Sequence, residues 1–298
     1  MISLRAQVET IIQEELANAG VAVDWDMNEI HVLPNSKVVI EHTSSEGTLS
    51  QALIEQFFPT EKAGIEVSHF TSLDSFKSIA TSNELRLGSL LKRLNEQEFK
   101  PFAEDFGLSG YLDTSDGEAY YKVLMEGLFY TSFTNPEPND PNYMWQLFGD
   151  KGKGVKLTVQ VSPIKRRAEL RRVRYSSKSE ALKSLISSLM RRIEKECGRH
   201  FIMRGISRVG AFYLPLGYSL ELEEETRLLV KSWGDGPAHE LVSGSAAQAY
   251  LPLELGAGAN EFCSLKIIEV QSGPQSNRAE IDNALANSKF SGARRSNA

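Results

Sequence analysis

The sequence predicts an α+β fold, and three observations lead to this prediction. Within residues 129–161 an aromatic strand, a proline-rich turn, a short helix and a second strand follow one another. The first 60 residues combine helical periodicity with short β-branched runs. The 298 residues are 41% hydrophobic and 24% charged, which suffices for one large globular domain, or for one domain with an appendage.

The first 60 residues are expected to form a small α+β appendage. Apolar residues at helical spacing predict a helix over 4–18, and runs at 21–25 and 37–41 read as short strands. A second helix is expected over 50–58. The segment carries no catalytic constellation, so a partner-binding or covering role is expected.

A strand at 66–70 begins the main domain, which we expect to span residues 61–298. His69 lies at the end of this strand, and Thr71 or Ser72 is positioned to cap the following helix. On spacing alone His69 is either a core histidine or a ligand contact. The polar residues 91–128 are expected to form a lid or a substrate-facing insertion.

The window 129–161 carries the clearest local signals. Period-two alternation in its first strand puts Tyr130 and Ser132 on one face. Trp145 either anchors the short helix in the core or lines a cleft. The Gly149–Gly154 turn lacks the register of a phosphate-binding loop, and no dinucleotide-binding fingerprint occurs in the chain.

The charge of the chain is unevenly distributed. Its net charge is −6, but residues 165–208 carry 14 Lys/Arg against four Glu, a local charge of about +10 that leaves about −16 elsewhere. Such a segment could bind RNA or DNA, or it could pair with the acidic remainder of the protein. The cations assigned to nucleic acid are Arg166, Arg167, Arg171 and Arg172. The same segment contains an amphipathic helix over about 182–193.

An acidic run at 219–230 is the most informative carboxylate cluster. If it is a strand, alternation puts Glu223, Glu225 and Arg227 on one face. The alternative interpretation is an exposed acidic loop beside a strand.

The order of these segments resembles a known family. A strand ending in Ser-Phe-Thr, then Met-Trp and Gly-Lys-Gly-Val, is followed by the Glu223–Arg227 run and by a 266–274 segment that ends in Gly-Pro. This order resembles the bacterial DUF2971 family over roughly residues 65–290. The strand with His69, the helix after it and the Leu-Arg-Leu run at 85–87 are similar to the first motif of the ADP-ribosyltransferase superfamily.

The resemblance implies a split β-sheet with flanking helices that grips NAD as a substrate. It assigns Glu225 to stabilising an oxocarbenium-like state and Glu223 to orienting the acceptor. The residues implied in NAD binding are His69, Thr71, Arg86, Tyr130, Ser132 and Arg227. Either Tyr130 or Ser132 would be the residue that the second strand contributes to the site.

The implied activity is transfer of ADP-ribose from NAD to RNA, DNA or protein, in a toxin or a phage-defence effector. The alternatives are an NAD glycohydrolase and a non-catalytic module that binds nucleic acid or an antitoxin-like protein. No apolar run is long enough for a membrane helix and no signal layout is seen, so we expect a cytoplasmic protein. Two cysteines without CxxC spacing give no indication of a metal site.

Overall fold

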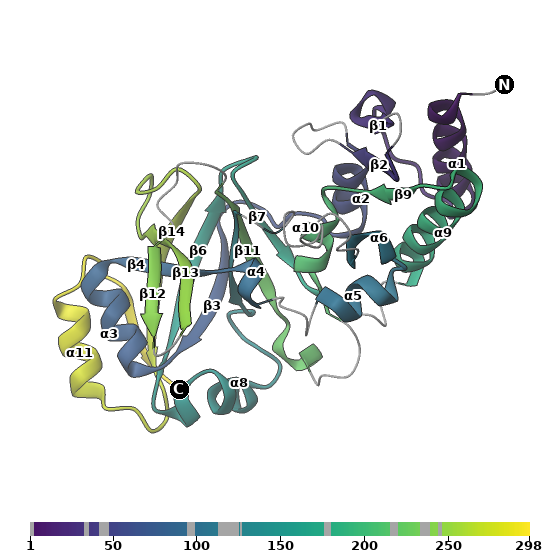
Figure 1. The fold of residues 1–298 in the computed structure, drawn as a ribbon. Coiled ribbons are helices and arrows are strands. Elements are labelled where there is room, and N and C mark those ends of the chain that lie inside the picture. Colours follow the sequence, from purple (N-terminus) through teal and green to yellow (C-terminus); the bar gives the residue numbers. More distant parts are fainter. Residues whose placement is uncertain are drawn as a thin grey trace. The chain divides into compact units, whose positions relative to one another are not determined.

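The computed structural model of the chain is an α+β structure with several sheets (Figure 1). It describes residues 3–32, 36–41, 48–93, 99–112, 125, 127–175, 180–214, 220–232, 239–243 and 246–298.

The chain divides into two compact units, and each contains segments from distant parts of the sequence. Unit 1 comprises Met1–Pro59, Arg93–Glu126 and Val173–Gly217. Unit 2 comprises Thr60–Lys92, Gly127–Arg172 and Tyr218–Ala298. The first break lies near the expected boundary at residue 60. However, two segments of the expected single domain over 61–298, Arg93–Glu126 and Val173–Gly217, belong to unit 1.

Long-range pairing explains why those segments belong to unit 1. Strand β2 pairs in parallel with β9, with Val38 opposite His200. Helix α9 packs against α1, and Arg192 of α9 binds Glu14 and Glu15 of α1 at 2.8 Å each. The segment 91–128, expected as a lid or a substrate-facing insertion, contributes the buried Tyr111, whose hydroxyl donates to the Met203 carbonyl at 2.9 Å. None of these three contacts is readable from local sequence.

The described elements of unit 1 are α1 (Leu4–Asn18), η1 (Met27–Glu29), β1 (Ile30–Val32), β2 (Val38–Glu41), α2 (Leu49–Phe57), α5 (Phe99–Asp105), α6 (Ser109–Leu112), β8 (Arg174–Tyr175), α9 (Glu180–Cys197), β9 (His200–Ile202), α10 (Ile206–Ala211) and β10 (Tyr213–Leu214). The apolar stripe predicted for α9 is buried as expected. The run at 21–25 is irregular backbone and not a strand.

The elements of unit 2 are β3 (Ile65–Thr71), α3 (Leu73–Ser82), β4 (Glu84–Ser89), α4 (Leu90–Arg93, at the unit boundary), β5 (Leu128–Phe133), α8 (Pro141–Leu147), η2 (Asp150–Gly152), β6 (Val155–Pro163), β7 (Ala168–Arg172), η4 (Leu220–Glu223), β11 (Thr226–Lys231), β12 (His239–Ser243), β13 (Ala246–Glu254), β14 (Cys263–Ser272), α11 (Arg278–Ala286) and β15 (Arg294–Asn297). They form a six-stranded sheet of order β12-β13-β4-β5-β11-β7 and a four-stranded sheet of order β15-β14-β6-β3.

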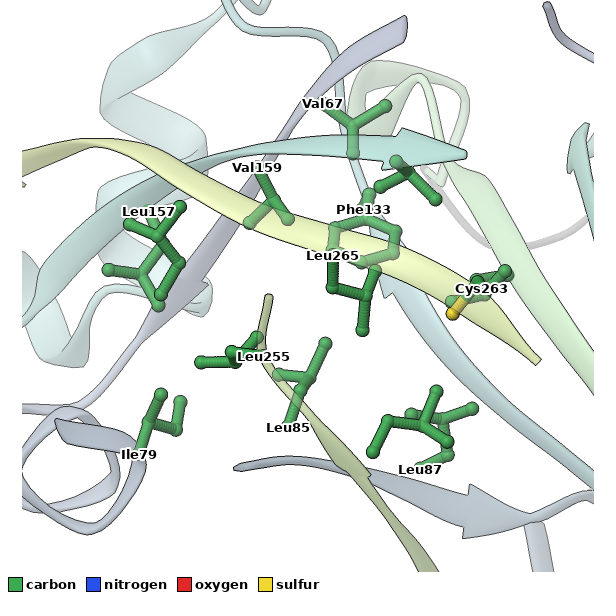
Figure 2. Close-up of a cluster of buried hydrophobic side chains, with 14 of the residues drawn as sticks. Val67, Ile79, Leu85, Leu87, Phe133, Leu157, Val159, Leu255, Cys263 and Leu265 are labelled. Carbon is green, nitrogen blue, oxygen red and sulfur yellow. The ribbon is translucent and has the colours of Figure 1, made fainter. Parts of the chain in front are cut away.

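One apolar core joins the two sheets of unit 2. The four-stranded sheet contributes alternate residues such as Val67, Leu157 and Leu265, and the six-stranded sheet contributes Leu87 and Phe133 (Figure 2). Helices α3 and α11 lie side by side and add their own buried residues to this core (Figure 1). Because alternate residues of each strand face this core, the intervening residues face away from it.

Strand β5 connects the two sheets. It pairs with β11 along its whole length but with β4 only at Gly88↔Tyr130 and Ser89↔Phe129. Just beyond its end, Thr134 forms an isolated bridge with Ser68 of β3. Strands β4 and β5 therefore diverge from Gly88, and β5 runs on toward the other sheet.

The loop after β5 forms the expected short helix. Asp140 caps α8 by accepting from the Tyr143 backbone N–H at 2.9 Å, and Pro141 occupies its first turn. Trp145 is buried with its ring edge-on to Phe70, at a centroid distance of 4.8 Å, so it anchors the helix in the unit. At Gly154 a Cβ would overlap the Thr71 carbonyl oxygen, so the return into β6 requires glycine.

Candidate functional site

A chain of hydrogen bonds joins three residues from distant segments of unit 2. The Ser132 hydroxyl on β5 donates to Glu225, which lies immediately before β11. The Ser132 carbonyl oxygen lies 3.1 Å from His69 Nδ1 on β3. Because a carbonyl oxygen only accepts, His69 Nδ1 carries the proton in this contact. The junction of the two sheets thus assembles His69, Ser132 and Glu225.

Glu225 also forms a two-point ion pair with Arg227. Arg227 Nε lies 2.7 Å from Oε1, and Nη2 lies 3.1 Å from Oε2. The exposed fractions of the two residues are 6% and 4%, so the pair is shielded from water. Two contacts of this kind fix the position of the carboxyl group relative to the guanidinium.

The guanidinium of Arg227 also lies over the ring of Tyr130, 5.0 Å from its centroid. Tyr130 and Ser132 both face away from the core. Arg227 is the register partner of Ser132 on the neighbouring strand β11, so its side chain lies on the same face of the sheet. Of the two candidates on β5, Ser132 contacts Glu225 directly, whereas Tyr130 contacts Arg227, the ion-pair partner of Glu225. A planar cation already lies over the Tyr130 ring, which is the geometry of a cation–π contact.

Glu223 does not follow the alternation expected for it. The strand begins only at Thr226, Glu223 ends the 3-10 helix η4, and Glu224 has a φ of 46°. This left-handed residue breaks the period of two, so the expected shared face of Glu223 and Glu225 has no strand to support it. Leu222, beside Glu223, is 44% exposed.

Two residues near the site were missed by the sequence analysis. The Thr134 hydroxyl donates to the Glu223 carbonyl oxygen at 2.6 Å, and Glu224 accepts from the Asn139 backbone N–H at 2.9 Å. Both contacts tie the segment before β11 to the end of β5 and to the loop that follows it. Thr134 directly follows the predicted strand, and this position is the sequence signal that could have identified it as a residue near the site.

The two other predicted NAD contacts are Thr71 and Arg86. Thr71 is buried at the end of β3, where it pairs with Val155 of β6. Arg86 is exposed on β4, and its guanidinium lies over the ring of Tyr250, 5.0 Å from the centroid. The hydrogen bonds that join His69, Ser132, Glu225 and Arg227 to one another involve neither Thr71 nor Arg86.

The arginines assigned to nucleic acid do not form the expected exposed group. Arg171 is 1% exposed, and its Nε binds Glu169 at 2.8 Å, because alternation in β7 turns Ala168 and Leu170 into the core and Arg171 to the other face. That prediction is wrong for Arg171, which is a buried structural cation.

The three other arginines of that group are exposed but engaged. Arg167 binds Glu261 at 2.5 Å, Arg172 binds Glu61 at 2.8 Å, and Arg166 also has a partner. The basic segment is moreover divided between the two units after Arg172. These contacts favour the alternative that the segment pairs with acidic residues of the same chain.

Unit 1 contains a buried carboxyl group, that of Glu41, which the sequence analysis did not single out. Glu41 is 0% exposed and accepts from the backbone N–H of Ser50 at 2.8 Å and from its hydroxyl. Burial raises the pKa of Glu41 to about 7, against the lowering effect of these hydrogen bonds and of Arg208. Unit 1 therefore carries a group that titrates near neutral pH.

Among the described residues no group of three or more His, Cys, Asp or Glu side chains is arranged to hold a metal ion. No described helix has the length and apolarity needed to cross a membrane.

Comparisons with known proteins add no relative. No family model, no curated protein and no solved structure matches the chain.

Proposed function

We propose that the protein cleaves the nicotinamide–ribose bond of NAD and transfers ADP-ribose to a macromolecule. The observation that carries this proposal is the convergence of His69, Ser132 and Glu225 where β5 runs between the two sheets. It agrees with the resemblance to the DUF2971 family and to ADP-ribosyltransferases, in which a split sheet binds NAD.

Glu225 has the chemistry that the reaction needs. As the C1′–N bond of NAD breaks, its electron pair leaves with nicotinamide and positive charge develops on the ribose. A carboxylate beside this charge stabilises it and accepts a hydrogen bond from the ribose 2′-hydroxyl. An acceptor nucleophile then forms a bond to C1′ and loses its proton to a base. Arg227 supports this role because its two contacts hold the Glu225 carboxyl group in a fixed position.

The other residues would position NAD. Ser132 holds one oxygen of Glu225, and His69 would contact the adenosine ribose through its ring edge. Tyr130 would bind nicotinamide, since its ring already carries a planar cation. Arg227 occupies that position, so it would have to move aside when nicotinamide binds.

A second candidate function is a binding module without catalysis. The observation that favours it is that Arg227 and Ser132 together engage both carboxylate oxygens of a residue that is only 6% exposed. Such a carboxylate is stabilised in place and poorly available to a substrate.

Incubation with NAD labelled in its adenylate part tests the proposal. Purified protein would be mixed with RNA, DNA or cell protein, and nicotinamide release and label transfer would be followed together. Release with label on one macromolecule supports the transferase and names the acceptor class. Release without transfer supports the glycohydrolase, and no release from folded protein supports the binding module.

A further inference from the structure

Strand β4 presents an uncovered glycine on the face of the six-stranded sheet that points away from the core. Leu85 and Leu87 of β4 face the core, so Arg86 and Gly88 face the opposite side. A Cβ placed on Gly88 would meet no atom within 4 Å, which means open space above this residue. Gly88 is also the point from which β4 and β5 diverge.

Two tyrosines border this space in register. Tyr250 of β13 and Tyr130 of β5 both lie opposite Gly88, on its two sides. With a strand spacing of about 4.8 Å, their Cα atoms lie about 10 Å apart. Each ring carries a guanidinium at 5.0 Å, Arg227 over Tyr130 and Arg86 over Tyr250, but Tyr130 is 3% exposed whereas Tyr250 is half-buried. The accessible aromatic side of the space is therefore that of Tyr250.

Arg86 adds a positive charge beside the space. Its guanidinium lies over the Tyr250 ring at 5.0 Å, and among the described residues it has no carboxylate partner. Arg167 provides the contrast, because it lies 5.8 Å over Phe262 but is also paired with Glu261. A guanidinium oriented by a ring and free of a carboxylate suits a phosphate.

We propose that the space over Gly88 is a subsite for a planar nucleobase, which would lie beside Tyr250 while Arg86 binds the phosphate of the same nucleotide. This inference rests on the proposed function, because that function supplies the nucleotide that would bind here. The nucleotide is either the adenylate half of NAD or a residue of a nucleic-acid acceptor. Base–aromatic contact with an adjacent cation is the chemistry common to both.

Calorimetric titration of the full chain with AMP tests the subsite directly. Tyr250→Ala is expected to weaken AMP binding roughly 5- to 150-fold, the usual effect of losing one base–aromatic contact. Ribose 5-phosphate, which lacks the base, should bind more weakly and depend on Arg86 but not on Tyr250. Equal AMP affinity in wild type, Tyr250→Ala and Arg86→Ala would overturn the proposal, as would absence of AMP binding.

A variant that fills the space over Gly88 tests whether a loss of AMP binding comes from the subsite and not from misfolding. Gly88→Val removes no side-chain contact, suits a strand and occupies the open space, so it should fold and lose AMP binding. Gly292→Val is its control, because Gly292 also has nothing within 4 Å of an added Cβ. Arg167→Ala is the control for Arg86→Ala. A folded Gly88→Val protein that binds AMP like wild type would refute the subsite.

Kinetic measurements show whether the bound nucleotide comes from NAD or from a nucleic-acid acceptor. They also test the subsite separately from the proposed enzymatic function. A raised KM for NAD in Tyr250→Ala identifies the adenylate half of NAD as the ligand. An unchanged KM with weaker binding of a single-stranded oligonucleotide identifies the acceptor. If wild type binds AMP through Tyr250 but releases no nicotinamide, the proposed function fails and the subsite stands.

Discussion

Replacing Glu225 with glutamine is expected to destabilise unit 2 as well as to stop catalysis. Glu225 and Arg227 are 6% and 4% exposed and share two contacts, at 2.7 and 3.1 Å. Removing one partner of a buried ion pair costs about 3–5 kcal/mol, because the remaining charge is left uncompensated. Glutamine keeps an oxygen for one of these contacts, so the expected cost is about 3 kcal/mol, at the low end of that range.

Chemical denaturation followed by tryptophan fluorescence measures this cost. Trp145 reports on unit 2, because it is buried against Phe70. Glu169→Gln is the control, since Glu169 and Arg171 form another buried pair two residues apart on the neighbouring strand β7, where Glu169 also binds Lys231. Both variants should lose stability, Glu169→Gln at least as much because it leaves two cations without their carboxylate, whereas only Glu225→Gln should lose activity.

A double-mutant cycle with Arg227→Met tests whether the two residues are coupled. The combined variant should cost less than the sum of the single variants, by about 0.5–3 kcal/mol, because it removes both charges together. Costs that add within about 0.3 kcal/mol would refute the reasoning, since they would show that the pair contributes nothing as a pair.

Three further outcomes follow from single residues. The folded pKa of Glu41, about 7, exceeds its ordinary value of 4.5. Its contribution to stability is therefore complete below pH 4.5 and is lost as the pH rises to about 7, by about 3 kcal/mol in total. Denaturation at several pH values should show this slope in wild type and not in Glu41→Gln; an equal slope in both would reject the assignment. Gly154→Ala should lower the melting temperature markedly, because its Cβ would overlap the Thr71 carbonyl oxygen; an unchanged melting temperature would contradict this. Arg171→Ala should cost about 3–5 kcal/mol and Arg172→Ala less than about 1 kcal/mol, since only Arg171 is buried; equal costs in denaturation would contradict the burial argument.

Local signals in the sequence sufficed for several elements. The apolar stripe of α9 and the turn chemistry before α8 act within a few residues, so periodicity and capping reveal them. The same alternation that defines a strand brought Tyr130 and Ser132 to one face.

The remaining features depend on distant contacts. The pairing of β2 with β9 joins residues 38 and 200, and it draws the middle of the chain into unit 1. Burial of Arg171 follows from its partner Glu169 and from the place of β7 in the sheet. Glu223 was misplaced because the left-handed backbone of Glu224 has no clear sequence signature.

The role of Glu225 in breaking the nicotinamide–ribose bond can be measured as nicotinamide release from NAD by wild type, Glu169→Gln and Glu225→Gln. We expect release by wild type and by Glu169→Gln, and a rate about 10²- to 10³-fold lower in folded Glu225→Gln, as for other losses of transition-state charge stabilisation. No release by wild type, or equal rates in Glu225→Gln and Glu169→Gln, would contradict it.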